Sequence, residues 1–411
     1  MTTPSPPGQV SAAVLKRRLG LTLLVLYGVG ITVGAGIYVL IGRVAGHAGP
    51  HAPWAFMLAA VVMALTVASY AELCTRFPVS AGEAAYMREA FGSRLASTLT
   101  GLLTIVIGVV SSAAVAIGSA GYLHALTGWP REVLVLAVIL CLGLVAAWGI
   151  LESVILAAIF TVIEVGGLLL VILAATATGV PFAAAIVTPP PMEAAVLSGI
   201  AAASLLAFFA FIGFEDLANV AEEAQDPHRT LPRAMALTLV IATLLYVMVA
   251  AVAVTAVPPA ELAASEAPLS LVFQRLAGTS PATISLIAIV ATLNTVLAQM
   301  TMATRVVYGL ARQGDLPSVL GAVHEPTGTP MLATVLVVTC VAVLALGVSL
   351  ERLAEGTSLA TLIIFALVNL ALLRLKRRGI ALAHRHVTVP TWVPVAGFAT
   401  CLGMAALALV K

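Results

Sequence analysis

Charged side chains are scarce in this sequence. Of its 411 residues only 9% are Asp, Glu, Lys or Arg, whereas 61% are hydrophobic. Soluble domains carry about 25% charged residues, and a surface in water needs such groups. A surface in lipid tolerates almost none of them. The composition therefore excludes a soluble globular protein and indicates one that lies largely within a membrane.

An excess of one charge and clustered thiols are also missing. The formal net charge is +2, and no basic stripe alternates with aromatic residues, which speaks against nucleic acid as a partner. The four cysteines stand apart in apolar runs, without the paired spacing of a disulfide or metal site. The seven histidines fall between the apolar segments. We therefore expect no metal site and no cofactor.

Motifs of enzymes are absent as well. The sequence contains no His-Glu-x-x-His run, no Gly-x-Ser-x-Gly elbow and no phosphate-binding loop. The segments between the apolar runs are too short to hold a catalytic domain. The sequence therefore predicts a protein that is not an enzyme.

Long apolar segments are what the sequence has in abundance. A transmembrane helix needs about twenty predominantly apolar residues. Eleven segments qualify, at 19–42, 53–75, 95–123, 131–149, 152–176, 194–221, 233–257, 282–305, 330–349, 353–374 and 390–410. The sequence therefore predicts an all-α, polytopic integral membrane protein with about eleven transmembrane helices.

The distribution of basic residues predicts an orientation. If the N-terminus is cytoplasmic, most Lys and Arg residues fall on the cytoplasmic side, among them Arg17, Arg18, Arg374 and Lys376. This asymmetry follows the positive-inside rule. The first apolar segment is too long for a cleaved signal peptide. We therefore expect a multi-pass protein of the cytoplasmic membrane, with a cytoplasmic tail at 1–18.

Two of the apolar segments are interrupted by glycine. The first contains the run YGVGITVGAG at 27–36, and the sixth contains Gly213 just before two carboxylates. Five spans separate their starts, and this odd offset gives the two halves opposite orientations, as in inverted-repeat transporters with paired broken helices. Gly30 and Gly34 alone would also fit close helix packing. The matching interruption in the sixth span favours a binding site.

Four sequence motifs follow one another along the chain. They are VGAGIYVLIG at 33–42, SYAEL at 69–73 with RFPVSAGEAAYMREAFG at 76–92, FFAFIGFEDLANVAEEAQDPHRTLPRAM at 208–235 and TRVVYGLARQGDLP at 304–317. Together they resemble the amino acid/polyamine/organocation superfamily, in particular bacterial amino acid permeases and cationic amino acid transporters. The resemblance covers nearly the whole chain.

This resemblance implies a leucine-transporter-like fold. Its ten-helix core would span 19–374 and consist of two inverted repeats of five helices, 19–176 and 194–374, with the first and sixth helices broken. A cytoplasmic loop and a trailing eleventh helix would follow at 375–411. Family members usually have one span more than the eleven placed here, which leaves the oligomeric state open.

The resemblance also places the substrate at the two breaks. Its carboxylate would bind the backbone N–H groups of Gly34, Ala35 and Gly36, because a broken helix leaves donors free and the N-terminus of the next half-helix favours an anion. The backbone carbonyls that would hold its amine lie near Thr32, Ala210 and Phe211, and Gly213 at the second break is also expected to belong to the substrate site. Phe209 matches an aromatic gate of the family, although packing is the commoner role of a Phe in a span.

Carboxylates within the spans are few, and each needs a reason. Glu164 lies in the middle of the fifth span, where several proton-coupled relatives carry a lysine. It carries a proton, binds a cation or pairs with a donor elsewhere, and burial favours the neutral form.

Glu215 either couples protons or accepts hydrogen bonds where the half-helix restarts. Asp216, about 100° further around the helix, is expected to face another space. Glu72, near a span end, is expected to be solvated or ion-paired.

These features predict a secondary transporter of amino acids that works by alternating access, as a proton-coupled symporter or as an exchanger. Its expected partners are a small amino acid or amine, protons and the lipid bilayer. Exchange of a polyamine or another organic cation is the alternative, supported by Glu164 and Glu215. A channel, the weaker rival, would need a continuous polar path.

Overall fold

The computed structural model describes residues 19–78, 82–148, 154–221, 224–278, 280, 282–324, 329–379 and 387–409. These residues form helices and connecting turns, and their strand-like pairing is limited to two isolated bridges, Leu19 with Ala224 and His324 with Thr329. The all-α prediction is confirmed. The expected cytoplasmic tail at 1–18 lies outside the described residues.

A helix or a broken helix occupies each of the eleven predicted spans. In chain order these are α1 (Leu21–Val33) with α2 (Ala35–Ala48), α3 (Ala52–Arg76), α5 (Arg94–Thr127), α6 (Arg131–Trp148), α7 (Val154–Ala177), α9 (Ala194–Ala210) with α10 (Asp216–Asn219), α11 (Pro227–Ala256), α14 (Ala282–Arg312), α15 (Met331–Gly347), α16 (Leu350–Arg377) and α17 (Trp392–Leu409). Seven described helical stretches are long and apolar enough to cross a membrane, and one of them, Leu21–Arg76, contains the first two spans. The helices α9, α15 and α17 are shorter but also apolar.

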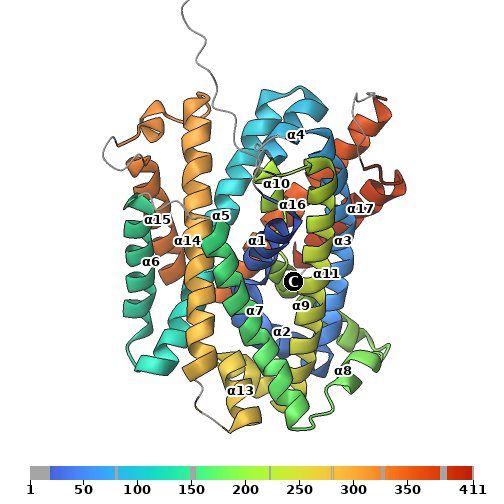
Figure 1. The fold of residues 1–411 in the computed structure, drawn as a ribbon, viewed down its shortest axis with the longest axis vertical. Helices are drawn as coiled ribbons and strands as arrows, with labels where there is room; N and C mark the ends of the chain where they lie inside the picture. Colours follow the sequence, from blue (N-terminus) through green and yellow to red (C-terminus); the bar gives the residue numbers. More distant parts are fainter. Residues whose placement is uncertain are drawn as a thin grey trace, which may run out of the picture.

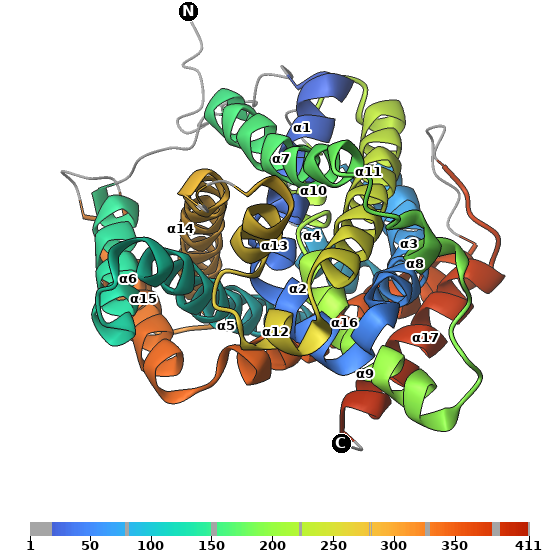
Figure 2. The ribbon, with the colours of Figure 1, turned by 90° about the horizontal axis from the view of Figure 1, so that it is seen from below.

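Short helices connect the spans at both ends of the bundle. They are η1 (Gly49–His51), α4 (Gly82–Phe91), α8 (Ala183–Val187), α12 (Pro259–Ala264), α13 (Pro268–Ala277) and η3 (Ser318–Gly321). Figure 1 shows α4 at one end of the bundle and α8 and α13 at the other. We call these the α4 end and the α13 end. Seen from the α13 end, α6 and α15 lie on one side of the bundle and α17 on the opposite side (Figure 2).

Small residues bring the central helices together. A Cβ atom added to Gly108 of α5 would lie 3.0 Å from Cβ of Ala303 in α14, and one added to Gly101 would lie 3.1 Å from a methyl carbon of Leu310. Apolar surface is no driving force between helices in lipid, so such close van der Waals contact is what holds them. The pair α5 and α14 therefore forms a tightly packed unit in the bundle.

The contacts between helices follow the pattern expected of two five-helix repeats, in which each span of the first repeat corresponds to the span five positions later. The second span, α3, packs against the seventh, α11, and the third, α5, packs against the eighth, α14. In addition, α3 packs against α9 as α11 packs against α1, and α5 packs against α16 as α14 packs against α7. A shift by five spans converts one contact of each such pair into the other. The repeat boundaries themselves, 19–176 and 194–374, stay a prediction.

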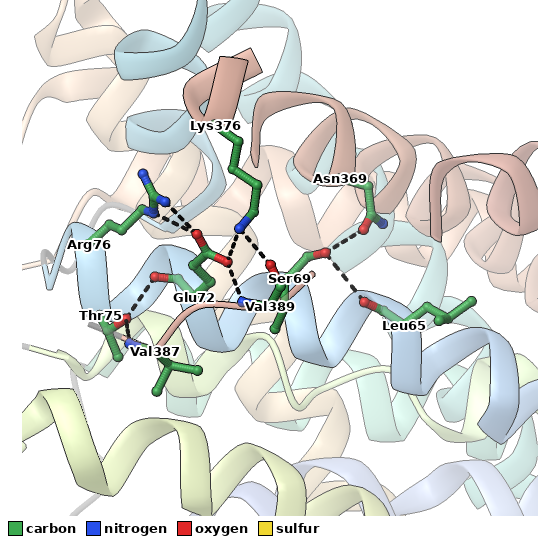
Figure 3. A network of polar contacts seen from close by, with 9 residues as sticks. All are labelled: Leu65, Ser69, Glu72, Thr75, Arg76, Asn369, Lys376, Val387 and Val389. Atoms are coloured by element: carbon green, nitrogen blue, oxygen red, sulfur yellow. Dashed lines mark hydrogen bonds and ion pairs between the residues drawn. The ribbon is translucent and has the colours of Figure 1, made fainter. Parts of the chain in front are cut away.

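A buried ion-pair network attaches the lead-in to α17 to the bundle (Figure 3). Glu72 of α3 is 0% exposed, and its carboxylate lies 2.5 Å from Nη2 of Arg76 and 2.6 Å from Nζ of Lys376 in α16. The same carboxylate accepts the N–H of Val389 at 2.8 Å, and Lys376 donates to the carbonyl of Val389 at 2.7 Å. Of the two states expected for Glu72, solvated or ion-paired, the structure shows the ion-paired one.

Candidate functional site

The first span breaks at a single residue. Helix α1 ends at Val33 and α2 begins at Ala35, with Gly34 between them at φ −31° and ψ −114°. The N–H of Gly34 still donates to the carbonyl of Gly30 at 3.1 Å. The N–H groups of Ala35 and Gly36 lie in the first turn of α2, where no intrahelical acceptor exists. Of the three predicted carboxylate donors, these two are therefore the ones at the new helix N-terminus.

The sixth span breaks over several residues. Helix α9 ends at Ala210, and the chain turns through 211–215 before α10 resumes at Asp216. Gly213 has φ 129°, a conformation that favours glycine, and a Cβ atom there would lie 2.6 Å from a methyl carbon of Ile31 in α1. Its N–H donates to Oε2 of Glu215 at 2.8 Å. Glu215 thus accepts a hydrogen bond from the backbone within the break, whereas its side chain does not cap the start of α10, and both of its predicted roles stay predictions.

The two breaks touch each other. A Cβ atom added to Gly36 would overlap the backbone of Ala210 at the end of α9. A Cβ atom added to Gly34 would overlap the hydroxyl of Thr295 in α14, and Gly30 faces α7 in the same way. The glycines of the first span therefore serve close packing as well as the break, because each brings its backbone against a different neighbouring helix.

Tyr246 of α11 joins the two breaks. Its hydroxyl lies 2.6 Å from the carbonyl oxygen of Thr32 and 2.7 Å from that of Ala210, so it can donate to either. Its ring packs against Phe211 at 4.9 Å and Phe56 at 5.6 Å between centroids. Two of the carbonyls expected to hold the substrate amine are thus within reach of one hydroxyl. Sequence reasoning missed Tyr246, although a buried Tyr hydroxyl in an apolar span usually has a hydrogen-bond partner.

Phe209 lies in the last turn of α9, directly before the break, and is 6% exposed. The neighbouring Phe208 packs its ring 5.9 Å from that of Phe365 in α16. Burial beside the break agrees with a gate over the substrate and with a packing role. The gate stays a prediction.

Glu164 is fully buried in α7. Its Oε1 accepts a long hydrogen bond of 3.5 Å from Nδ2 of Asn294 in α14. Within the described residues, its Oε2 has no hydrogen-bond partner. Tyr38 of α2 donates to its backbone carbonyl at 2.6 Å, which ties α7 to the half-helix after the first break. The carboxyl therefore lies beside that half-helix with one oxygen available for a proton or a cation.

A small cavity of about 30 Å³ lies towards the α4 end, and Glu83, Glu215 and Asp216 all line it. The expectation that Glu215 and Asp216 face different spaces is wrong, because the Glu215 side chain folds back to the N–H of Gly213. Burial raises the pKa of Glu83, which accepts a hydrogen bond from Tyr70 at 2.8 Å. Among the described residues, no group of three His, Cys, Asp or Glu side chains could hold a metal ion.

Comparison with known proteins confirms the resemblance seen in the motifs. A family profile described as amino acid permease matches residues 19–410. A branched-chain amino acid permease of Bacillus subtilis is 31% identical over 389 residues, which cover 89% of this chain and 82% of the relative. A vacuolar cationic amino acid transporter of Arabidopsis thaliana is 32% identical over 397 residues, covering 90% and 62%.

A methylthioribose transporter of Bacillus subtilis is 29% identical over 417 residues, which cover 96% of this chain and 89% of the relative. These three relatives match most of this chain, but their names refer to chemically different substrates. The family profile spans both helix breaks and every predicted span. The chain therefore belongs to the amino acid permease family, whose members are secondary transporters in membranes.

Proposed function

We propose that this protein carries amino acids across the cytoplasmic membrane by alternating access, with the substrate held between the two helix breaks. The observation that carries the proposal is the junction at Tyr246, whose hydroxyl reaches carbonyls of both broken spans. At the same junction α2 begins, with the N–H groups of Ala35 and Gly36 free of intrahelical acceptors. Backbone donors and acceptors side by side suit a molecule that carries both a carboxylate and an ammonium group.

The α4 end is proposed to face the cytoplasm. Arg88 in α4, Arg94 at the start of α5 and Arg312 at the end of α14 lie there. Cytoplasmic loops carry an excess of such residues. This orientation makes the N-terminus cytoplasmic and places the α13 end outside the cell.

Proton coupling is proposed to run through Glu164. The side chain is fully buried, and its Oε2 lacks a partner among the described residues. A bare charge at span depth costs about 2.5–3.5 kcal/mol on insertion scales, and uptake of a proton removes that cost. Because Tyr38 connects Glu164 to α2, protonation and movement of the half-helix can be linked. Glu215 is the second candidate for this role.

An organic cation such as a polyamine is the alternative substrate. The observation that favours it is the cavity towards the α4 end, which three carboxylates line. A cation leaving the central junction on that side would meet Glu215 first, beside the sixth-span break. The Arabidopsis thaliana relative, named as a cationic amino acid transporter, agrees with this alternative.

Uptake into proteoliposomes tests the proposal. The purified full chain is offered neutral, acidic and basic amino acids and a diamine, with and without a pH gradient. We expect an amino acid to be accumulated, and faster when the outside is acidic. Uptake of the diamine alone would favour the organic cation, and flux far above carrier turnover would indicate a channel. Failure to accumulate or exchange any amino acid would overturn the proposal.

A further inference from the structure

A second and larger cavity lies at the α13 end. Its volume is about 320 Å³, and its walls come from the ends of α2, α5 and α15, the starts of α6 and α16, and the segment between α12 and α13. Sites for small ligands begin at roughly 300 Å³. The pair of His47 in α2 and Glu351 in α16, 2.5 Å apart, holds two of these walls together. The cavity is therefore large enough for one amino acid.

Charges of both signs line this cavity on different elements. Arg43 comes from α2, Arg131 and Glu132 from the start of α6, and Glu266 from the segment before α13. Arg131 and Glu266 form an ion pair across the cavity. The remaining lining is largely aliphatic, with hydroxyl groups such as that of Ser349. Two positive and two negative groups balance, which suits a zwitterion better than a plain cation or anion.

The carboxylate of Glu266 can accept a further hydrogen bond. One of its oxygens pairs with Arg131, whereas its Oε2 is buried and has no hydrogen-bond partner within the described residues. A buried acceptor without a donor is costly, and such groups in proteins usually have a partner. A ligand ammonium group in the cavity would supply the missing donor.

The cavity lies near the central junction, and closely packed residues of α2 and α5 line it. Val39, which lines the cavity, follows Gly36 by three residues in α2, roughly 4.5 Å along the helix axis. A Cβ atom added to Gly118 of α5 would overlap Val39, and one added to Gly121 would lie 2.7 Å from the carbonyl oxygen of Glu266. These close contacts pack α2, α5 and the segment before α13 into a floor. A ligand in the cavity would thus lie close to the two helix breaks without contacting them.

We propose that this cavity is a second, outer binding site for a zwitterionic amino acid, which the substrate occupies before it reaches the helix breaks. The ligand carboxylate binds Arg131 and the ligand ammonium binds Glu266, so binding opens the ion pair between them. Arg43 and Glu132 keep the cavity neutral around the ligand. The identity of the ligand rests on the proposed function, whereas the site rests on the cavity and its charges.

Binding stoichiometry tests the outer site. Tritiated L-leucine and L-arginine are titrated, each alone, onto the purified full chain, and we expect two molecules of the transported one per chain. Glu266→Gln and Arg131→Gln should each weaken one of the two binding events at least about tenfold and leave the other unchanged. The control is Arg275→Gln, which removes an exposed ion pair of 2.7 Å with Glu261 at the same end of the molecule. It should keep both events.

Cysteine labelling gives a second readout that depends on the cavity alone. Ser349→Cys is introduced with Cys141→Ala and Cys340→Ala, which remove the exposed native thiols among the described residues. A membrane-impermeant cationic thiol reagent should label Cys at this position, and L-leucine or L-arginine should slow the labelling. Glu266→Gln should abolish this protection, and Arg275→Gln should preserve it.

The outcomes separate the outer site from the proposed function. A protein that accumulates amino acids but binds one molecule per chain, without protection of the engineered thiol, has no outer site. A protein that neither accumulates nor exchanges amino acids refutes the transport proposal, and protection of the thiol then decides on the outer site by itself. Equal behaviour of Glu266→Gln and Arg275→Gln in both assays would also overturn the outer site.

Discussion

The family resemblance led us to expect a lysine where this chain carries Glu164, and the structure gives the Glu164 carboxyl few hydrogen-bond partners. Its only described side-chain hydrogen bond comes from Asn294 at 3.5 Å. A neutral, protonated carboxyl fits these surroundings, whereas a charged carboxylate would need a cation beside it. The proposed link between protonation and the packing of α7 beside α2 can therefore be tested at this one residue.

Glu164→Gln mimics the protonated side chain, so we expect the variant to bind substrate and to exchange it across the membrane. It should lose accumulation driven by a pH gradient, because no proton can leave or join the amide. Counterflow and pH-driven uptake in proteoliposomes measure the two activities. The exposed Glu193→Gln is the control and should retain both. Accumulation by Glu164→Gln under a pH difference alone would assign the coupling elsewhere, with Glu215 tested next.

Phe209 lies beside the sixth-span break, and its proposed role as a gate can be tested by changing the size of its side chain. Phe209→Ala should weaken substrate binding and leave the occluded state leaky, whereas Phe209→Trp should retain part of the transport, because an aromatic ring still covers the site. Equilibrium binding and efflux from loaded proteoliposomes are the measurements. Phe398→Ala in α17, outside both breaks, is the control for loss of a half-buried ring. Wild-type transport by Phe209→Ala would rule out the gate.

At the scale of the elements, the broken spans combine two demands on glycine. A bulky β-branched side chain at Gly36 would block close approach to the N–H groups in the first turn of α2. The structure adds a packing cost, because a side chain at this position meets the backbone of Ala210. A substitution at Gly36 therefore affects both the break in the first span and the contact between α2 and α9.

We expect Gly36→Val to lose substrate binding and also to lower thermal stability, with overpacking costing about 1–3 kcal/mol. The matched control is Gly166→Val in α7, where an added Cβ atom meets nothing within 4 Å. Binding and unfolding temperature are measured for both variants in detergent. If Gly36→Val binds substrate with wild-type affinity, the N–H groups at the start of α2 do not form the carboxylate site.

Tyr246 tests the connection between the two breaks. Tyr246→Phe keeps the ring but removes the hydroxyl that reaches Thr32 and Ala210, so two buried carbonyls lose the one donor that they share. We expect a loss of about 1–3 kcal/mol in stability. Tyr86→Phe is the matched control, since the Tyr86 hydroxyl is buried without a partner in the described part of the chain. It should be neutral or stabilising, and equal unfolding temperatures for the two variants would contradict the bridge.

At the scale of the whole molecule, α17 packs against α16 and α3, and the segment before it is also held by a buried charged network. Glu72 contacts Arg76, Lys376 and the N–H of Val389 at once. Removing one member of such a buried network leaves uncompensated charges in place. The charged network at the segment before α17 therefore centres on a single carboxylate in α3.

Glu72→Ala should cost about 3–5 kcal/mol in stability and expose the segment before α17 to proteolysis, because Arg76 and Lys376 are left without their buried counter-charge. The exposed pair of Glu261 with Arg275 is the comparison, and Glu261→Ala should cost less than about 1 kcal/mol. Thermal unfolding and limited proteolysis check both variants. A Glu72→Ala protein as stable as the Glu261→Ala protein would show that other contacts hold α17.

The sequence by itself determined the eleven spans, their approximate bounds and the two that break. This information is local, because a bilayer requires about twenty apolar residues for each crossing and closes every backbone hydrogen bond within the helix. The first and sixth spans break where the sequence places their glycines, whereas α7 stays continuous although Gly166 and Gly167 follow Glu164. The family motifs lie at these same local features, so the function class followed as well.

Only the tertiary structure decided which groups meet. The Tyr246 hydroxyl contacts carbonyls 36 and 214 positions away, and Glu72 accepts the N–H of a residue 317 positions away. The outer cavity likewise gathers Arg43, Arg131 and Glu266 from three separate elements. No periodicity within one span encodes such partners, because helix position in the bundle depends on small-residue contacts between spans. The physical reason is that span formation depends on local apolar length, whereas a polar partnership depends on how the helices pack.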